Sequence, residues 1–407
     1  MWMLWLACAG PEDEATCTAD FTPCEDGICL LGACEPVAAC EGDCSSHPPL
    51  ADTNLRECMG PAESGLDGTI DCPGAAGAPD CADTALCGQD AQYGDDLQAQ
   101  VRFSREGGPE VVVEDLATGL GWQGCALGLT GEDCAAGEAL TGDWYTADDS
   151  CQGSTWGGHS DWRLPTAAEL HSIVDFSVTS PAFDAQAFPN SPSRFAEDYD
   201  AWWIECAWSA DALAGDDGVA WALMTNSGDI AEGSGIKYHP HDKEALGWEG
   251  CTARCVRGGA ALETARFHVL EPVAEERVVA DLATGRMWTA CSWGQERGDC
   301  AGEAAMVDWA GALAACEGLV HGGLDDWRLP DVKELRSLVD PTRRLPAVDP
   351  EIFPNPPWYG PSTTQNIGQY WSSTARWYNS FALYVDLGFG FSHFYVMDEG
   401  RHVRCVR

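Results

Sequence analysis

The block Asp161–Asp175 (DWRLPTAAELHSIVD) returns with few changes as Asp326–Asp340 (DWRLPDVKELRSLVD). Its first half is typical of a strand that ends at a proline. Its second half places apolar residues at i, i+3 and i+4, as an amphipathic helix does. A capping-box pattern starts this helix in both copies, at Thr166–Glu169 and Asp331–Glu334. The block therefore predicts a strand, a turn and a capped helix, present twice.

The repeat extends well beyond this block. Val113–Trp122 parallels Val279–Trp288, and each copy closes on Arg-Cys-Val-Arg, at Arg254–Arg257 and Arg404–Arg407. Alternating apolar and polar residues around Ala-Thr-Gly predict a β-hairpin with Gly119 at positive φ. So long a repeat indicates tandem domains rather than a solenoid, whose periods are about 20 to 50 residues. The predicted fold class is α+β, with two tandem disulfide-rich domains after a small Cys-rich segment.

Acidic residues dominate the composition, with 65 Asp and Glu against 22 Lys and Arg and a formal net charge of -43. Phosphate contacts need clustered Lys and Arg, so nucleic acid is excluded as a partner. Anionic polysaccharides and acidic lipid surfaces are disfavoured by the same repulsion. Solubility in a salty exterior explains the charge most simply. Weak Ca²⁺ binding by surface carboxylates is the alternative, and no other cofactor is expected.

The 21 cysteines indicate an oxidising compartment. Cys8 stands alone after the short apolar run Met1–Ala7. This run resembles a bacterial lipobox, which implies an exported protein lipidated at Cys8; a plain secretory signal and a start codon assigned too late are alternatives. No other stretch has the ~20 apolar residues of a membrane span, so membrane contact is expected only through a lipid anchor. Every later group of cysteines is even in number: those within 17–44, 58–87, 125–255 and 291–405.

Composition and repeat divide the chain into five segments. The Cys-rich second segment has too few apolar residues for a hydrophobic core and is expected to form a stalk ordered by disulfides. Zinc is disfavoured there because its cysteines lack paired C-x₂-C spacing. The segments are a signal or lipobox-like segment (1–8), the stalk (9–50), the first domain with its lead-in (51–258), a connector (259–277) and the second domain (278–407).

Five consecutive motifs together carry a family resemblance. They are D-x-x-T-G-x-x-W, W-x₂-A-x₃-C, the D-W-R-L-P block, W-S-S and a terminal V-R-C-V-R. This pattern resembles the Lcl C-terminal domain family, named for a domain of a bacterial collagen-like adhesin and long catalogued as a domain of unknown function. The second copy carries every part, including Trp371-Ser372-Ser373, whereas the first departs at Ala207–Ala210.

The order of elements is also similar to the C-type lectin fold. There, the cysteine of the W-x₂-A-x₃-C helix forms a disulfide with the last strand. The resemblance implies the pairs Cys151–Cys255 and Cys316–Cys405. The remaining cysteines of the two domains would then form Cys125–Cys134, Cys291–Cys300 and Cys206–Cys251.

No catalytic residue is predicted. Arg163 with Glu169, and Arg328 with Glu334, could be read as acid–base pairs, but arginine is a poor proton donor. A structural salt bridge or helix cap is therefore favoured for both pairs. The R-L-P-T-x-x-E run also resembles formylglycine-generating enzymes, which depend on a reactive cysteine pair with copper, and no such pair is evident. His239-Pro-His241 is interpreted as a loop, and no metal site is predicted.

Aromatic residues crowd the last forty positions. On strands whose side chains alternate between two faces, some of these rings are expected to face solvent and to stack on a ligand. Core packing is the alternative for many of them. The candidate binding residues are Trp371, Trp377, Tyr378, Tyr384, Phe391 and Tyr395.

The predicted function is that of a non-catalytic binding or adhesion protein of a bacterium. It would be extracellular or anchored in the outer membrane by lipid, with a glycan or a protein as ligand. The resembled adhesin domain binds glycosaminoglycans, but the charge of -43 favours a neutral glycan or a protein here. An oxidoreductase related to formylglycine-generating enzymes and a purely structural envelope lipoprotein are the alternatives.

Overall fold

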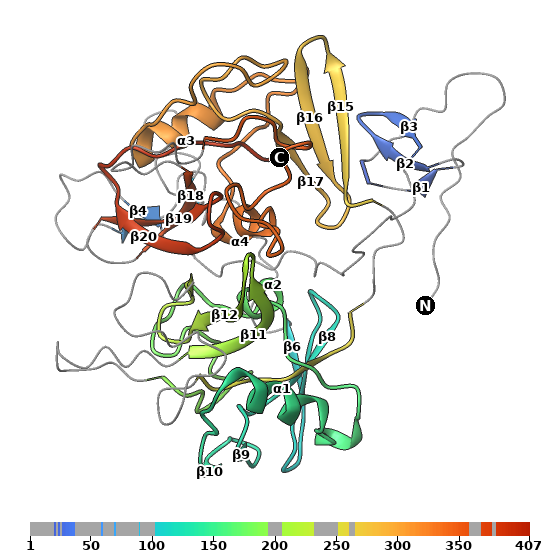
Figure 1. Cartoon of the computed structure of the whole chain (residues 1–407), viewed down its shortest axis with the longest axis vertical. Helices are drawn as coiled ribbons and strands as arrows, with labels where there is room; N and C mark the ends of the chain where they lie inside the picture. Colours follow the sequence, from blue (N-terminus) through green and yellow to red (C-terminus); the bar gives the residue numbers. More distant parts are fainter. Residues whose placement is uncertain are drawn as a thin grey trace.

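Two successive units of the chain repeat one order of elements, as the duplicated sequence predicts. Figure 1 shows them one above the other, the first mainly in cyan and green and the second from gold to red. Both are built from small antiparallel sheets and short helices, which is the predicted α+β class. The computed structural model describes residues 20–21, 23–24, 27–36, 58–59, 69–70, 89, 102–193, 206–231, 251–259, 265–357, 368–376 and 380–407.

The first unit contains two main sheets, one two-stranded hairpin and two α-helices. The larger sheet has the order β14-β8-β7-β6, so the end of the unit pairs with its beginning. Its strands are β6 (Phe103–Glu106), β7 (Val112–Asp115), β8 (Leu120–Gln123) and β14 (Val256–Arg257). The second sheet holds β11 (Cys206–Leu213), β12 (Asp216–Met224) and β13 (Ile230–Ala231). The remaining elements are the hairpin β9 (Leu129–Thr130) and β10 (Ala136–Gly137), the helices α1 (Trp144–Gln152) and α2 (Ala167–Ser172), and the 3-10 turn Trp156–Gly158.

The second unit follows the same plan. One three-stranded sheet opens it, and a second three-stranded sheet near the C-terminus corresponds to β11–β13. The strands are β15 (Phe267–Val273), β16 (Glu276–Asp281), β17 (Arg286–Thr289), β18 (Gln369–Ala375), β19 (Phe381–Asp386) and β20 (Ser392–Val396). The helices are α3 (Trp309–Glu317) and α4 (Val332–Ser337).

The predicted hairpin forms in both units with the same register. Val113 pairs with Trp122 between β7 and β8, and Val279 pairs with Trp288 between β16 and β17. The turn glycine has a φ of 71° at Gly119, in the left-handed region where only glycine avoids a steric cost. The predicted hairpin and its glycine turn are confirmed.

The signature block differs from its prediction in one respect. Its helix starts with the predicted capping box: Glu169 N donates to Thr166 Oγ1 at 3.1 Å, and Thr166 N donates to Glu169 Oε2 at 2.8 Å. The predicted strand before it is wrong, because Arg163 makes a single bridge with Val256. The proline at 165 has no N–H to donate, so the ladder cannot extend past this bridge.

The cores of the two units are continuous. One cluster of buried apolar side chains includes Leu170 and Trp221 from the first unit and Leu335 and Leu387 from the second. The units meet through corresponding elements, α2 with α4 and β13 with β20. Such an arrangement resembles the self-complementary contact of a two-fold dimer, here formed within one chain.

The described part of the predicted stalk packs on the second unit. It forms β1 (Pro23–Cys24), β2 (Gly27–Leu30) and β3 (Ala33–Glu35), which lie beside β15 and β16 in Figure 1. Leu30 is buried in the same apolar cluster as Met287, and Arg407 Nη1 donates to Asp20 Oδ2 at 3.2 Å. This segment is therefore an attached module rather than a separate spacer.

Two further short strands are described before the first unit, β4 (Cys58–Met59) and β5 (Thr69–Ile70), which pair with each other. None of the helices in the described ranges combines the length and apolarity that crossing a bilayer requires.

Candidate functional site

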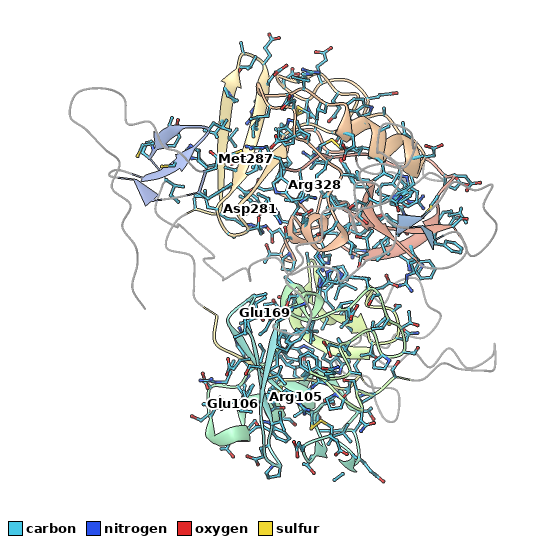
Figure 2. The ribbon with its side chains drawn as sticks, turned by 180° about the vertical axis from the view of Figure 1, so that it is seen from behind. Arg105, Glu106, Glu169, Asp281, Met287 and Arg328 are labelled. Carbon is cyan, nitrogen blue, oxygen red and sulfur yellow. A yellow bond between two sulfur atoms is a disulfide. The ribbon has the colours of Figure 1, made fainter. Side chains whose placement is uncertain are left out.

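The Arg–Glu pair of the signature block forms a two-pronged ion pair in each copy. Figure 2 labels one member of each pair, Glu169 in the first copy and Arg328 in the second. Arg163 donates to Glu169 through Nη1 at 2.8 Å and Nη2 at 2.6 Å. Arg328 donates to Glu334 at 2.7 and 2.6 Å. Both carboxylates are buried, and each also accepts a backbone N–H at the start of its helix. In each copy these contacts hold the helix to the segment that precedes it. This is the structural role that the sequence favours.

The second copy adds a further cation to this pair. Arg286 Nε lies 2.8 Å from Glu334 Oε1, at a position where the first copy has Leu120. Burial opposes ionisation of Glu334, but Arg328 and Arg286 hold its pKa below the usual range. The second copy therefore places more charge around the same carboxylate.

The terminal Arg-Cys-Val-Arg motif also serves the scaffold. Arg254 Nη1 donates to the carbonyls of Gln123 and Gly124, at 2.8 and 2.7 Å, and its guanidinium lies over the ring of Phe188 at 4.6 Å. Burial lowers the pKa of Arg254 to about 9. In the second copy Arg404 repeats the arrangement over Phe353, also at 4.6 Å.

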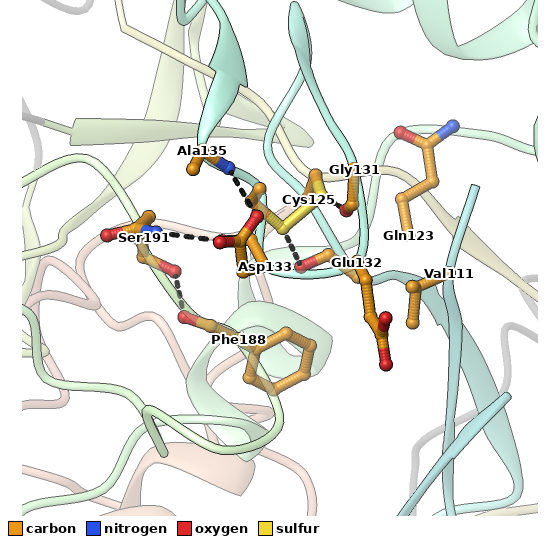
Figure 3. Close-up of a disulfide and its surroundings, with 12 residues drawn as sticks. Val111, Gln123, Cys125, Gly131, Glu132, Asp133, Ala135, Phe188 and Ser191 are labelled. Carbon is orange, nitrogen blue, oxygen red and sulfur yellow. Dashed lines mark hydrogen bonds between the residues drawn. A yellow bond between two sulfur atoms is a disulfide. The ribbon is translucent and has the colours of Figure 1, made fainter. Parts of the chain in front are cut away.

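Five disulfides join the cysteines of the two units. Two of them link the W-x₂-A-x₃-C helix to the end of its unit, and one is present in the first copy alone. Figure 3 shows Cys125 and its disulfide, with Gly131 and Asp133 close by. The pairs are Cys125–Cys134, Cys151–Cys255, Cys206–Cys251, Cys291–Cys300 and Cys316–Cys405.

Polar contacts cross the interface between the copies, and they are not symmetric. Lys333 on α4 donates from Nζ to the carbonyls of Ser172 and Val174, at 3.0 and 2.7 Å. The corresponding residue on α2 is Ala168, which cannot reciprocate. His171 is fully buried beside this contact. Burial, and the charges of Arg336 and Lys333, hold its pKa well below the usual range.

A second polar contact crosses the interface at the strand edges. Asp229 is buried, and Arg376 of the other copy donates from Nη2 to it at 3.4 Å and to Ser227 O at 2.9 Å. The Ser392 hydroxyl accepts from Ile230 N at 3.0 Å, and these two residues occupy corresponding strand positions. The two copies are therefore joined as one body by buried hydrogen bonds as well as by their common core.

The six aromatic candidates do not form one exposed surface. Trp371 and Tyr384 are buried, with Trp371 Nε1 donating to Val307 O at 3.1 Å, so their rings belong to the core. Phe391 is partly buried against the core, and Tyr395 is 44% exposed. The physical reason is the sheet β18–β20, whose inner face must bury large rings to exclude water. Trp377 and Tyr378 lie outside the described residues.

One arginine escaped the sequence interpretation. Arg401 is 1% exposed, and its guanidinium carbon lies over three rings: Trp371 at 4.3 Å, Tyr384 at 4.4 Å and Tyr395 at 4.6 Å. Its Nε and Nη1 atoms are buried without a hydrogen-bond partner among the described residues. A buried polar group without a hydrogen-bond partner lowers the stability of a protein. The two unpartnered nitrogen atoms of Arg401 therefore need an explanation.

The two copies differ at Arg401 in sequence, and this difference is the signal that could have identified it. In the first copy the corresponding position is Cys251, which is joined to Cys206. Gly142 forms the bridge with Cys251 that Val307 forms with Arg401, so the backbone positions correspond. A disulfide in one copy thus replaces a ring-enclosed cation in the other.

The described residues offer little for a metal. Across the ranges that the structure covers, no group of three or more His, Cys, Asp and Glu side chains is placed to hold a metal ion. Asp349 accepts from the backbone N–H of Glu351 at 2.9 Å and pairs with Arg343, as a turn residue does. His239 and His241, like Cys8, lie outside the described residues, and Ca²⁺ binding stays a prediction.

Comparison with known proteins identifies the repeated unit. The model of the Lcl C-terminal domain matches residues 111–257 and again residues 277–407. No curated protein and no solved structure matches the chain. The two matched ranges fall within the two structural units, each starting after the unit's first strand, and together span more than half of the chain. The chain belongs to the Lcl C-terminal domain family, of which it carries two tandem copies.

Proposed function

We propose that this protein is a non-catalytic, exported bacterial protein that binds a glycan or a protein ligand at the cell surface. One observation carries the proposal: the charged residues that the two copies share make the same fold-holding contacts in both. Arg163, Arg328, Arg254 and Arg404 hold helices, turns and chain ends in place. The two copies differ at other positions. A fold whose framework contacts are shared while other positions vary is typical of a scaffold that presents variable surfaces.

We also propose a C-type-lectin-like fold for each copy. Its support is the disulfide from the W-x₂-A-x₃-C helix to the end of the unit, formed by Cys151 in α1 and by Cys316 in α3. The sheet order β14-β8-β7-β6 gives further support, because it brings the two ends of the first unit together. A lectin-like scaffold would leave its loops for recognition.

Export has support from the disulfides, which persist outside the reducing cytosol. A lipid anchor at Cys8 is part of the proposal and rests on the sequence. The ten cysteines of residues 102–407 that the structure describes all lie in the five disulfides. This state suits a binding protein better than a formylglycine-type oxidoreductase, which needs a reactive pair. Labelling of native protein with a thiol reagent separates the two, since modification of a cysteine pair would favour the enzyme.

The proposal is tested by binding. The full chain, fluorescently labelled at an amine, is applied to a glycan array at about 0.15 M salt, where surface charge is screened over ~8 Å. Parallel arrays contain Ca²⁺ or a chelator, and a cross-linking experiment on bacterial envelopes tests protein ligands. Saturable binding to a glycan or to one protein is expected. No saturable binding in either experiment would leave a structural envelope role.

A further inference from the structure

The Arg401 site has the character of a recognition site. A buried guanidinium is normally paired with a carboxylate or fully hydrogen-bonded, because desolvating a charge is costly. Among the described residues no carboxylate forms an ion pair with Arg401, and two of its nitrogen atoms, Nε and Nη1, lack acceptors. Rings cover its faces at 4.3 to 4.6 Å, and the side chain of Tyr384 also forms a hydrogen bond with it. Cation–π contacts stabilise the charge but do not satisfy Nε and Nη1. The site thus retains donors for an incoming acceptor.

Tyr395 is the ring over this guanidinium that reaches the protein surface. Of the three covering rings, Trp371 is 0% and Tyr384 is 5% exposed, whereas Tyr395 is 44% exposed. A rotation of Tyr395 would therefore open a path to Arg401 while the other two rings stay in the core. Met306 is 38% exposed and lies against Gly400, the residue before Arg401, so it adds apolar surface near the arginine.

The surroundings select against an anionic ligand. Asp398 and Glu399 are exposed in the turn that leads to Arg401, and Glu399 acts electrostatically on that arginine. The chain as a whole carries a formal charge of -43. A sulfated or carboxylated ligand would meet repulsion from both, whereas a neutral hydroxyl can accept from arginine and donate to carboxylate.

We propose that Tyr395, Met306 and Arg401 form a subsite for a neutral sugar ring in the second copy. The apolar C–H face of the ring stacks on Tyr395 and touches Met306, as flat apolar surfaces do on aromatic side chains. A sugar hydroxyl accepts a hydrogen bond from Arg401, and neighbouring hydroxyls donate to Asp398 or Glu399. This inference rests on the proposed binding function and names its ligand class. The first copy lacks the subsite because Cys251 replaces the arginine.

The test compares two exposed tyrosines, one in each copy. Isothermal titration of the full chain uses a panel of linear glucose, mannose and galactose oligosaccharides, together with their sulfated forms. Tyr395→Ala should weaken binding of the neutral ligand by about tenfold, equivalent to roughly 1.4 kcal/mol. Tyr145→Ala is the matched control, since Tyr145 is 49% exposed in the first copy, and should leave the affinity unchanged. Sulfation should weaken binding to the wild type.

Each alternative outcome has a distinct meaning. Glycan binding that Tyr395→Ala leaves unchanged would overturn this subsite but keep the proposed function. A wild-type chain that binds a protein and no neutral glycan would do the same. Absence of any ligand would overturn both.

A second measurement avoids substitution altogether. Tyrosine nitration, mapped by mass spectrometry on the wild-type chain, should be slowed at Tyr395 by the bound oligosaccharide and not at Tyr145. Equal nitration of Tyr395 with and without a bound oligosaccharide would overturn the subsite.

Discussion

The two copies are alike where the fold is held and unlike where a ligand could be met. In both, a buried glutamate caps a helix and accepts two N–H groups from an arginine, at Arg163–Glu169 and Arg328–Glu334. Three residues before the terminal Arg-Cys-Val-Arg motif, however, the first copy has Cys251 in a disulfide and the second has Arg401 among three rings. The two copies therefore share the contacts that folding requires. They differ at a position where either a disulfide or a buried arginine is compatible with the fold.

The interface between the copies shows the same division. Apolar residues from both copies merge into one core, as expected of two related surfaces. The polar contacts are asymmetric, with Lys333 facing carbonyls across from it and His171 opposite Arg336. Burial of apolar side chains from both copies stabilises their contact. Hydrogen bonds that only one copy can donate then favour a single relative orientation of the two copies.

The largest expected effect distinguishes the two glutamates. Glu334→Gln should lower the free energy of unfolding by about 3 to 5 kcal/mol, because Arg328 is left mostly buried without its counter-ion. Glu169→Gln should cost less, since Arg163 is 37% exposed and water can solvate it. Urea unfolding at pH 7 measures both.

The pH dependence of the Glu334 contribution follows from its pKa. The folded pKa lies below the ordinary value of 4.5, so the stabilisation is present at neutral pH and is lost as acid protonates the carboxylate. Equal losses for Glu334→Gln and Glu169→Gln would show that Arg286 and deeper burial add nothing.

The next effect concerns the disulfide found in the first copy alone. Replacing Cys206 and Cys251 together by alanine should cost about 2 to 4 kcal/mol, because the link constrains the unfolded chain. Binding of the neutral oligosaccharide should persist in this variant, since the Arg401 subsite lies in the other copy. Differential scanning calorimetry reports the loss, and titration reports the binding. Loss of binding in a folded variant would contradict the separation of the copies.

The smallest expected effect is the change in the free energy of unfolding with pH that His171 causes. The unfolded imidazole gains a proton as the pH falls through about 6.5, whereas the folded one, with its depressed pKa, stays neutral. Stability should therefore fall with acidification, by at most about 1.4 kcal/mol per pH unit for this group. His402 in the second copy, whose pKa burial lowers to about 4, contributes a similar slope.

His171→Leu should remove about half of the combined slope between pH about 6.5 and about 5. His402→Leu is the matched variant in the second copy and should remove the other half. Urea unfolding across this pH range measures the slope, and an unchanged slope in both variants would contradict the assignment.

Much of the scaffold could be predicted because its signals are local. The capping boxes, the Gly119 turn and the amphipathic stripe each depend on residues within one turn or hairpin. The strand before Pro165 was predicted wrongly, since the pattern does not show how far a ladder extends. Trp371 and Tyr384 could not be placed from alternation alone, because strand alternation does not say which face is covered.

The order of amino acids was enough to establish a duplicated α+β protein built from two copies of one cysteine-rich unit. It did so because caps, turns and repeat spacing are written in neighbouring residues. Packing in three dimensions was needed to establish that the two units share a core and that the N-terminal module docks on the second. It also decided that Arg401 lies among three rings with donors unused. These features join residues far apart in the chain, and their burial depends on how whole sheets and helices pack.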